Sequence, residues 1–158
     1  MKKEGILELC TTNEDALSAL SLISEVLKEF ASYENAFGSD LENLLTYYRP
    51  KIHRYLWIYK VDNEIIGTIG LDEKTNFRAE IRRFFIAPSY REKGYGKQLF
   101  QSCLNQAKNN NYKELFLDVS VIQKRALRFY QSRGFIHTGY TNYGSYILEL
   151  ILENEKNG

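Results

Sequence analysis

Three basic residues and two glycines crowd into the stretch Arg91-Glu92-Lys93-Gly94-Tyr95-Gly96-Lys97, a pattern suited to binding an anion. Glycines let the backbone approach a ligand closely and adopt angles barred to other residues. A helix is expected from about residue 94, and its first backbone amides would be unpaired at the positive end of the helix dipole. Arg91, Lys93 and Lys97 add positive charge around the same point. The stretch predicts a phosphate site, and an ordinary strand-to-helix turn with surface lysines is the alternative.

Two familiar phosphate motifs do not fit this stretch. The Walker arrangement needs Ser or Thr after its Gly-Lys pair, and Gln98 stands there instead. The dinucleotide fingerprint needs a third glycine, and Leu99 occupies that position. What remains is the shorter pattern Arg91-x-x-Gly94-x-Gly96.

This pattern resembles the pyrophosphate-binding signature of the GNAT family of N-acetyltransferases. Residues 80–88 are similar to the strand that precedes the signature in that family, and residues 123–135 to its second cofactor segment. One residue departs from the family, because Gln123 replaces the usual Asn. Its amide can serve the same donor and acceptor roles on a longer arm.

The resemblance implies acetyl-CoA as a cosubstrate, and no metal is needed because the thioester is already activated. The family's strand opens at a bulge, and by resemblance the backbone of Phe85 and Ile86 holds the pantetheine arm. Apolar side chains also change parity, from odd positions at Ile81 to even ones at Phe84. A one-residue slip of this kind is what a bulge produces. The expected cofactor-binding residues are Phe85, Ile86, Arg91, Lys93, Gly94, Tyr95, Gly96, Lys97, Gln123 and Tyr130.

Glu80 is the candidate general base, because a partly buried carboxylate has a raised pKa that suits proton removal near neutral pH. The alternative is a structural ion pair with Arg78, Arg82 or Arg83. As a base, Glu80 would take the proton from the amine either directly or through a water molecule.

Tyr130 is the candidate general acid, since a phenol can protonate a departing thiolate. Ala126 lies four residues earlier, hence on the same helix face, where its small side chain lets the cofactor approach. A purely core aromatic is the alternative, as the chain has twelve tyrosines.

The implied function is transfer of an acetyl group from acetyl-CoA to a primary amine of a small molecule, by direct attack in a ternary complex. A protein or peptide acceptor is one alternative, and a non-catalytic CoA-binding sensor is another. In the family, the first helices and the last hairpin shape the acceptor pocket. Acidic and aromatic residues there, suited to a cationic amine, are Glu25, Glu29, Tyr33, Glu34, Asp40, Glu42, Tyr47, Tyr48, Tyr140, Asn142, Tyr143 and Tyr146.

The elements that must position these residues follow the order β-α-α-β-β-β-α-β-α-β-β. Strands are expected near residues 6–10, 55–61, 65–71, 79–87, 115–119, 135–140 and 146–152, and helices near 12–30, 41–48, 94–110 and 126–133. This order predicts a single α/β domain over residues 1–158, with a mixed, mostly antiparallel sheet flanked by helices.

Composition agrees with a globular domain, with 44% hydrophobic and 26% charged residues among 158. Residues 1–48 hold nine acidic and three basic side chains, whereas the rest of the chain is net basic. We expect no membrane span, no nucleic-acid partner, a cytoplasmic location and two buried thiols, Cys10 and Cys103. The sequence does not decide between a monomer and a homodimer.

Overall fold

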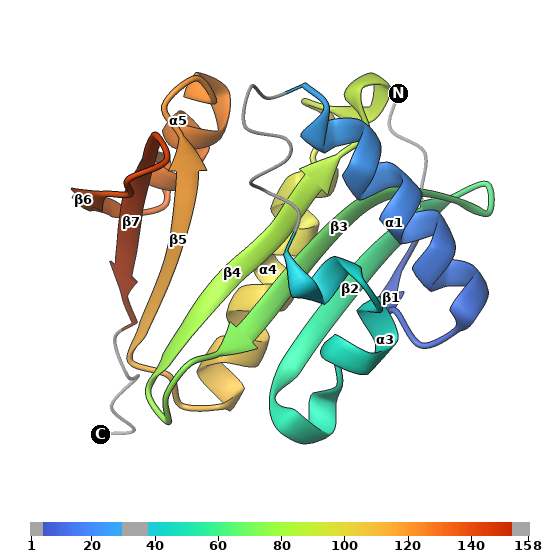
Figure 1. The fold of residues 1–158 in the computed structure, drawn as a ribbon, viewed down its shortest axis with the longest axis horizontal. Helices are drawn as coiled ribbons and strands as arrows, with labels where there is room; N and C mark the ends of the chain where they lie inside the picture. The colour runs from blue at the N-terminus through green and yellow to red at the C-terminus, as the bar shows by residue number, and fades with distance from the viewer. Residues whose placement is uncertain (1–4, 30–37, 153–158) are drawn as a thin grey trace.

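The fold is that of a computed structural model, which describes residues 5–29 and 38–152. Within these residues a seven-stranded sheet has the order β1-β2-β3-β4-β5-β7-β6 (Figure 1). The strands are β1 (Ile6–Leu9), β2 (Arg54–Val61), β3 (Glu64–Glu73), β4 (Arg78–Ile86), β5 (Glu114–Ser120), β6 (Ile136–Tyr140) and β7 (Ser145–Ile151). Only β4 and β5 pair in parallel, and the other neighbours are antiparallel. The predicted fold class and element order are confirmed.

Helices cover both faces of the sheet (Figure 1). One face carries α1 (Asn13–Leu27) and the short α3 (Leu44–Tyr47); the other carries α4 (Tyr95–Asn109), and α5 (Lys124–Ser132) follows β5. Thr12 caps α1 by accepting from the Asp15 amide, where the sequence allows either Thr12 or Asn13 as the cap. The helix expected over 41–48 is instead a 3-10 turn, η1 (Ser39–Leu41), and then α3, because Asn43 interrupts the helix and caps the second piece.

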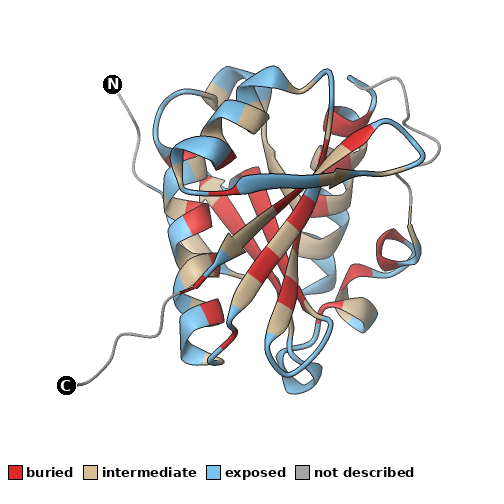
Figure 2. Cartoon of the chain, turned by 90° about the vertical axis from the view of Figure 1, so that its left-hand side faces the viewer, coloured by how far each residue is buried: buried red, intermediate tan, exposed pale blue. Residues whose placement is uncertain are grey.

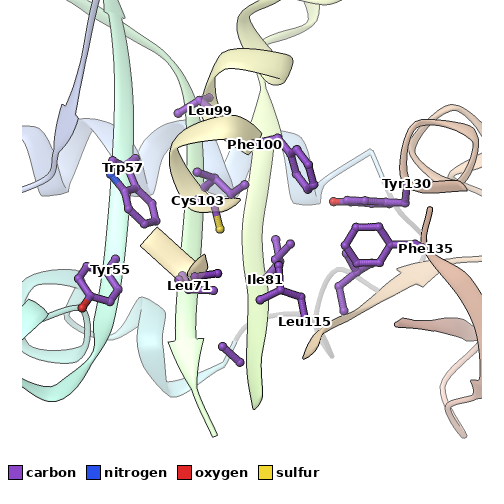
Figure 3. Packing of buried hydrophobic residues seen from close by; sticks show 14 of the residues in the cluster. Tyr55, Trp57, Leu71, Ile81, Leu99, Phe100, Cys103, Leu115, Tyr130 and Phe135 are labelled. Atoms are coloured by element: carbon purple, nitrogen blue, oxygen red, sulfur yellow. The ribbon is translucent and has the colours of Figure 1, made fainter. Parts of the chain in front are cut away.

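The core lies in two layers, one on each side of the sheet. The larger cluster packs β-strand side chains against α4, including Leu99, Phe100 and Cys103, while a smaller cluster packs α1 and α3 against the opposite face. Buried residues follow the strands through the centre of the molecule (Figure 2), and Figure 3 shows the close packing around Cys103. Both cysteines are buried and free, as predicted.

The sheet divides between β4 and β5. Their pairing ends at Glu80 and Phe116, although both strands continue for several residues, and the two ribbons diverge toward α5 (Figure 1). Just beyond this point β4 is bulged, because Arg83 and Phe84 lie opposite the single residue Ile69 of β3. The bulge that the change of parity predicts is therefore present. Arg83 takes a left-handed backbone conformation there, with φ of 52°.

Candidate active site

A cavity of about 300 Å³ occupies the point where the sheet divides. Glu80 reaches it from β4, Tyr130 from α5, and Asp118 from β5. The cavity exists because the diverging strands no longer fill the space between them with backbone hydrogen bonds. Both predicted acid–base residues therefore line one cavity.

Glu80 is the last residue of β4 that pairs with β5, and it lies on the opposite face from the α4 core. Lys74 Nζ and Arg82 Nε lie 3.5 and 3.8 Å from its Oε1. Arg78 pairs instead with Glu114, and Arg83 with Asp40. Burial raises the pKa of Glu80 above its ordinary value, and this effect outweighs the two nearby cations. Glu80 therefore combines both expected properties: it forms ion pairs with Lys74 and Arg82, and its carboxylate has the raised pKa of a general base.

The Tyr130 ring packs against the rings of Phe84, Phe129 and Phe135, with centroids 5.4–6.1 Å away. Its side chain extends from α5 toward β4 with the hydroxyl foremost (Figure 3). Only 6% of the residue is exposed, and its hydroxyl has no hydrogen-bond partner within residues 5–29 and 38–152. Burial raises the pKa of Tyr130, so the phenol stays protonated at neutral pH.

A second cavity, of about 610 Å³, lies beside the first and reaches the start of α4. Both cavities share a lining of Phe84, Phe85, Gln123, Ala126 and Tyr130, so they meet along this edge. An extended ligand could therefore run from the helix end to Glu80.

The start of α4 has the anion-site geometry that the glycines predict. Gly94 adopts φ of 90°, which glycine takes without steric cost. The backbone amides of Lys93, Gly94, Gly96 and Lys97 have no acceptor in the described part of the chain. A Cβ on Gly96 would stand 3.5 Å from the Phe84 ring, in contact with it, and both residues line the second cavity. Glycine therefore leaves more room in this cavity than a residue with a side chain would. Free amides, a helix dipole and room for a ligand coincide here.

The three basic side chains of the same turn do not all point to one place, contrary to what the sequence predicts. Arg91 donates through both terminal nitrogens to Glu29, at 3.1 Å each, and through Nε to the Ile86 carbonyl at 2.9 Å. Lys93 lies over the Tyr90 ring and does not line either cavity, whereas Lys97 does. Tyr95 is buried against other tyrosines, so only its backbone can face a ligand.

Beyond the bulge, the backbone hydrogen-bonding groups of successive β4 residues point alternately toward β3 and away from it. Ala87 donates its amide to Ile66 of β3, and the alternation of an antiparallel ladder gives Phe85 the same direction. Ile86 therefore turns its amide and carbonyl to the open side, while Phe85 contributes its ring to both cavities. Gln123 accepts from the Ser120 amide through Oε1 at 3.0 Å, and the residue lines both cavities.

Asp118 is a cavity residue that the sequence motifs do not indicate. Leu115, Leu117 and Val119 point into the core, so the alternation of β5 puts Asp118 on the other face. It accepts from the Tyr143 hydroxyl at 2.6 Å, and burial with this bond raises the pKa of Tyr143 to about 12. The strand alternation in the sequence was the signal that could have found it.

The expected acceptor residues are only partly brought together. Tyr143 lines the first cavity, and Glu29 the second. Asp40 and Tyr48 are instead buried and bonded to each other, and Tyr47 donates to buried Asp72. These three residues therefore form structural contacts instead of an open pocket wall. Tyr33 and Glu34 lie outside the described residues.

Residues 5–29 and 38–152 hold no group of three or more metal-ligating side chains. Nor does this described part of the chain include a helix with the length and apolar character needed to cross a membrane.

Fold and site together define an α/β class in which a parallel strand pair separates beside a helix that begins with unpaired backbone amides. The sequence pattern of the acetyltransferase (GNAT) family matches residues 22–135, more than half of the chain. The chain belongs to the GNAT family.

Individual relatives agree with this assignment. YjgM of Escherichia coli, an uncharacterised N-acetyltransferase, is 27% identical over 104 residues, which cover 64% of this chain and 62% of that protein. Human N-acetyltransferase 8 is 27% identical over 106 residues, covering 64% and 47%, and N-acetylaspartate synthetase of Xenopus tropicalis is 27% identical over 112 residues, covering 70% and 41%. The chain thus spans between 41% and 62% of the length of these relatives.

Solved structures share the fold over almost the whole chain. An acetyltransferase from Streptococcus agalactiae superposes with a TM-score of 0.79 at 22% identity, covering 94% of this chain and 98% of that one. The PaiA N-acetyltransferase of Thermoplasma acidophilum, in complex with coenzyme A, superposes with a TM-score of 0.77 at 21% identity, covering 93% and 99%.

Proposed function

We propose that this chain is an acetyl-CoA-dependent N-acetyltransferase acting on a primary amine of a small molecule. One observation carries the proposal: a partly buried carboxylate, Glu80, and an unpartnered buried phenol, Tyr130, line the same cavity at the division of the sheet. Family membership and the free amides at the start of α4 support the choice of acyl donor.

The residues present fit acetyl-CoA, which supplies an activated thioester when bound. The unpaired amides of Gly94, Gly96 and Lys97, with that of Lys93 beside them, would hold the diphosphate. The Ile86 amide would hold the arm that leads to the acyl group, because the Ile86 carbonyl already accepts from Arg91. Gln123 and Ala126 border the same path. Orienting the two reactants in this way accounts for much of the rate enhancement.

Glu80 and Tyr130 handle the protons. Glu80 removes a proton from the ammonium form of the acceptor, directly or through water, so that the free amine can attack the thioester carbon and form the new carbon–nitrogen bond. Tyr130 gives its hydroxyl proton to sulfur as the carbon–sulfur bond breaks. The first cavity, at about 300 Å³, is at the small end of the range for small-molecule pockets, which supports a small acceptor over a polypeptide.

Two measurements test the function. Calorimetry should detect binding of coenzyme A, and release of free thiol from acetyl-CoA should rise with at least one member of a panel of small amines. Thiol release with peptides but not with small amines would make the acceptor a polypeptide. Binding without any turnover would leave a CoA sensor, and the absence of binding would refute the proposal.

Glu29→Gln is expected to tighten coenzyme A binding. The Glu29 carboxylate occupies the Arg91 guanidinium and adds negative charge to the cavity that would hold the diphosphate. Both side chains are partly exposed, so the gain should be small, about two- to fivefold in Kd. Calorimetry at low and high salt checks this, since screening should shrink the difference. Glu14→Gln at the other end of α1 serves as the control, and equal affinities for all three proteins would contradict the prediction.

A further inference from the structure

The bulge in β4 depends on an unusual choice of residue. Arg83 adopts φ of 52°, a conformation that costs little for glycine but is unfavourable for a residue with a side chain. Its carbonyl accepts from the buried Thr68 hydroxyl at 2.7 Å, which fixes one end of the peptide unit. An arginine here needs further contacts to hold the backbone in place.

Those contacts come from Asp40 on η1. Arg83 Nε donates to Asp40 Oδ2 at 2.9 Å, and Nη2 donates to Oδ1 at 2.8 Å, the two-point geometry that makes arginine–carboxylate pairs strong. Arg82 and Tyr48 donate to the same carboxylate at 3.2 and 2.7 Å. Asp40 is completely buried, with 0% exposed. Burial alone would raise the pKa of Asp40, but these donors lower it by more than burial raises it. The pKa is therefore below its ordinary value, and the carboxyl is ionised at neutral pH.

The position of the bulge explains why its rigidity matters. Arg83 comes three residues after Glu80, which is the last residue of β4 paired with β5. It directly precedes Phe84 and Phe85, which line both cavities. Ile86 then turns its backbone to the open side. A change of a few tens of degrees at Arg83 would redirect all three residues relative to Glu80.

We propose that Asp40 is a positioning residue for the transfer reaction, which holds the Arg83 bulge and thereby aims the cofactor-facing end of β4 at Glu80 and Tyr130. This inference rests on the proposed acetyl transfer. Asp40 is too buried to touch a substrate itself, so it acts through Arg83. The diphosphate site on α4 is formed separately and should not depend on it.

Asp40→Asn removes the charge and cannot accept from two arginines in the same way. We expect kcat for acetyl transfer to fall roughly tenfold or more, because small displacements of reacting groups have effects of this size. The KM for acetyl-CoA should change by less than about threefold, since the diphosphate contacts are retained. Asn43→Ala is the control: it removes the cap of α3, where the Thr46 amide bonds Asn43, and should lower stability without changing kcat.

A double-variant cycle separates positioning from general loss of structure. Arg83→Gly accepts the left-handed conformation without needing Asp40. In this background Asp40→Asn should lower kcat by no more than about twofold, because coupled residues are not additive. Unchanged kcat in Asp40→Asn alone, or losses that multiply in the double variant, would overturn the proposal. If Asp40→Asn does not fold, Thr68→Val replaces it, since this change removes the other contact that fixes the Arg83 peptide.

Amide hydrogen exchange gives a readout that does not require turnover. Asp40→Asn should speed exchange in a peptide covering 83–87 by about tenfold and leave one covering 95–104 unchanged. If the wild-type protein turns over no amine and Asp40→Asn still speeds exchange at 83–87, the proposed function fails, while the finding that Asp40 holds the Arg83 bulge stands. If wild-type protein is active and exchange at 83–87 does not change, Asp40 does not hold the bulge.

Discussion

Replacing Tyr130 by Phe is expected to lower kcat for acetyl transfer by about 10- to 100-fold, the loss typical of removing one proton-transfer group. The phenol ring keeps its contacts with Phe84, Phe129 and Phe135, so the variant changes a single oxygen. Steady-state thiol release with saturating acetyl-CoA and amine measures the effect.

The same variant should not be destabilised. Tyr130 lines both cavities and its hydroxyl bonds no described residue, so removing that oxygen breaks no hydrogen bond within the described part of the protein. Thermal unfolding should therefore occur at the wild-type temperature or slightly above it. Tyr140→Phe, at an exposed tyrosine outside both cavities, is the matched control. Full activity in the Tyr130→Phe variant would reduce Tyr130 to a packing residue.

Burial acts on the two proposed proton-transfer groups in complementary ways. It raises the pKa of the Glu80 carboxyl, which makes the carboxylate a stronger base. It also raises the pKa of the Tyr130 phenol, which keeps the proton in place until a thiolate forms. The division of the sheet thus creates the cavity and the environment that suits both roles.

Local patterns in the sequence predicted the features that local geometry controls. The spacing of Gly94 and Gly96 after a strand indicated a turn with unpaired amides at the start of α4, and the change of parity between Ile81 and Phe84 indicated the bulge. Each signal lies within a few residues of the feature it predicts, because turns and bulges are set by the backbone preferences of adjacent residues.

Partners far apart in the chain were not predictable in the same way. Asp40 meets Arg83 across 43 residues, and Glu29 meets Arg91 across 62. Asp40 and Glu42 are both acidic residues in one short segment, yet one is fully buried and the other exposed. Residue type alone cannot distinguish them, since burial depends on how the segment docks onto the sheet. The sequence therefore indicated a role for Asp40 in the acceptor pocket, whereas in the fold Asp40 lies on η1 and binds Arg83 of the β4 bulge.

Glu80→Gln should have the largest effect on catalysis, lowering kcat near pH 7 by about 100-fold or more while coenzyme A affinity is retained. An amine acceptor is mostly protonated at this pH and needs a group that removes its proton. Near about pH 10 the free amine becomes abundant and the variant should recover much of the deficit, which a merely structural role would not produce. Glu114→Gln, at a strand carboxylate paired with Arg78 and outside both cavities, is the control.

The pH dependence of stability gives an independent check on Glu80, because its pKa is higher in the folded protein than the ordinary value of 4.5. Such a group stabilises the fold below its unfolded pKa and loses that contribution as pH rises through the folded pKa. At pH 7 the wild-type protein therefore carries a partly buried carboxylate that burial disfavours, whereas glutamine is neutral. Glu80→Gln should unfold at the same or a higher temperature than wild type at pH 7, and the difference should vanish near pH 4. A variant that is both inactive and clearly less stable at pH 7 would show that the ion pairs with Lys74 and Arg82 outweigh burial, and Glu80 would then be primarily structural.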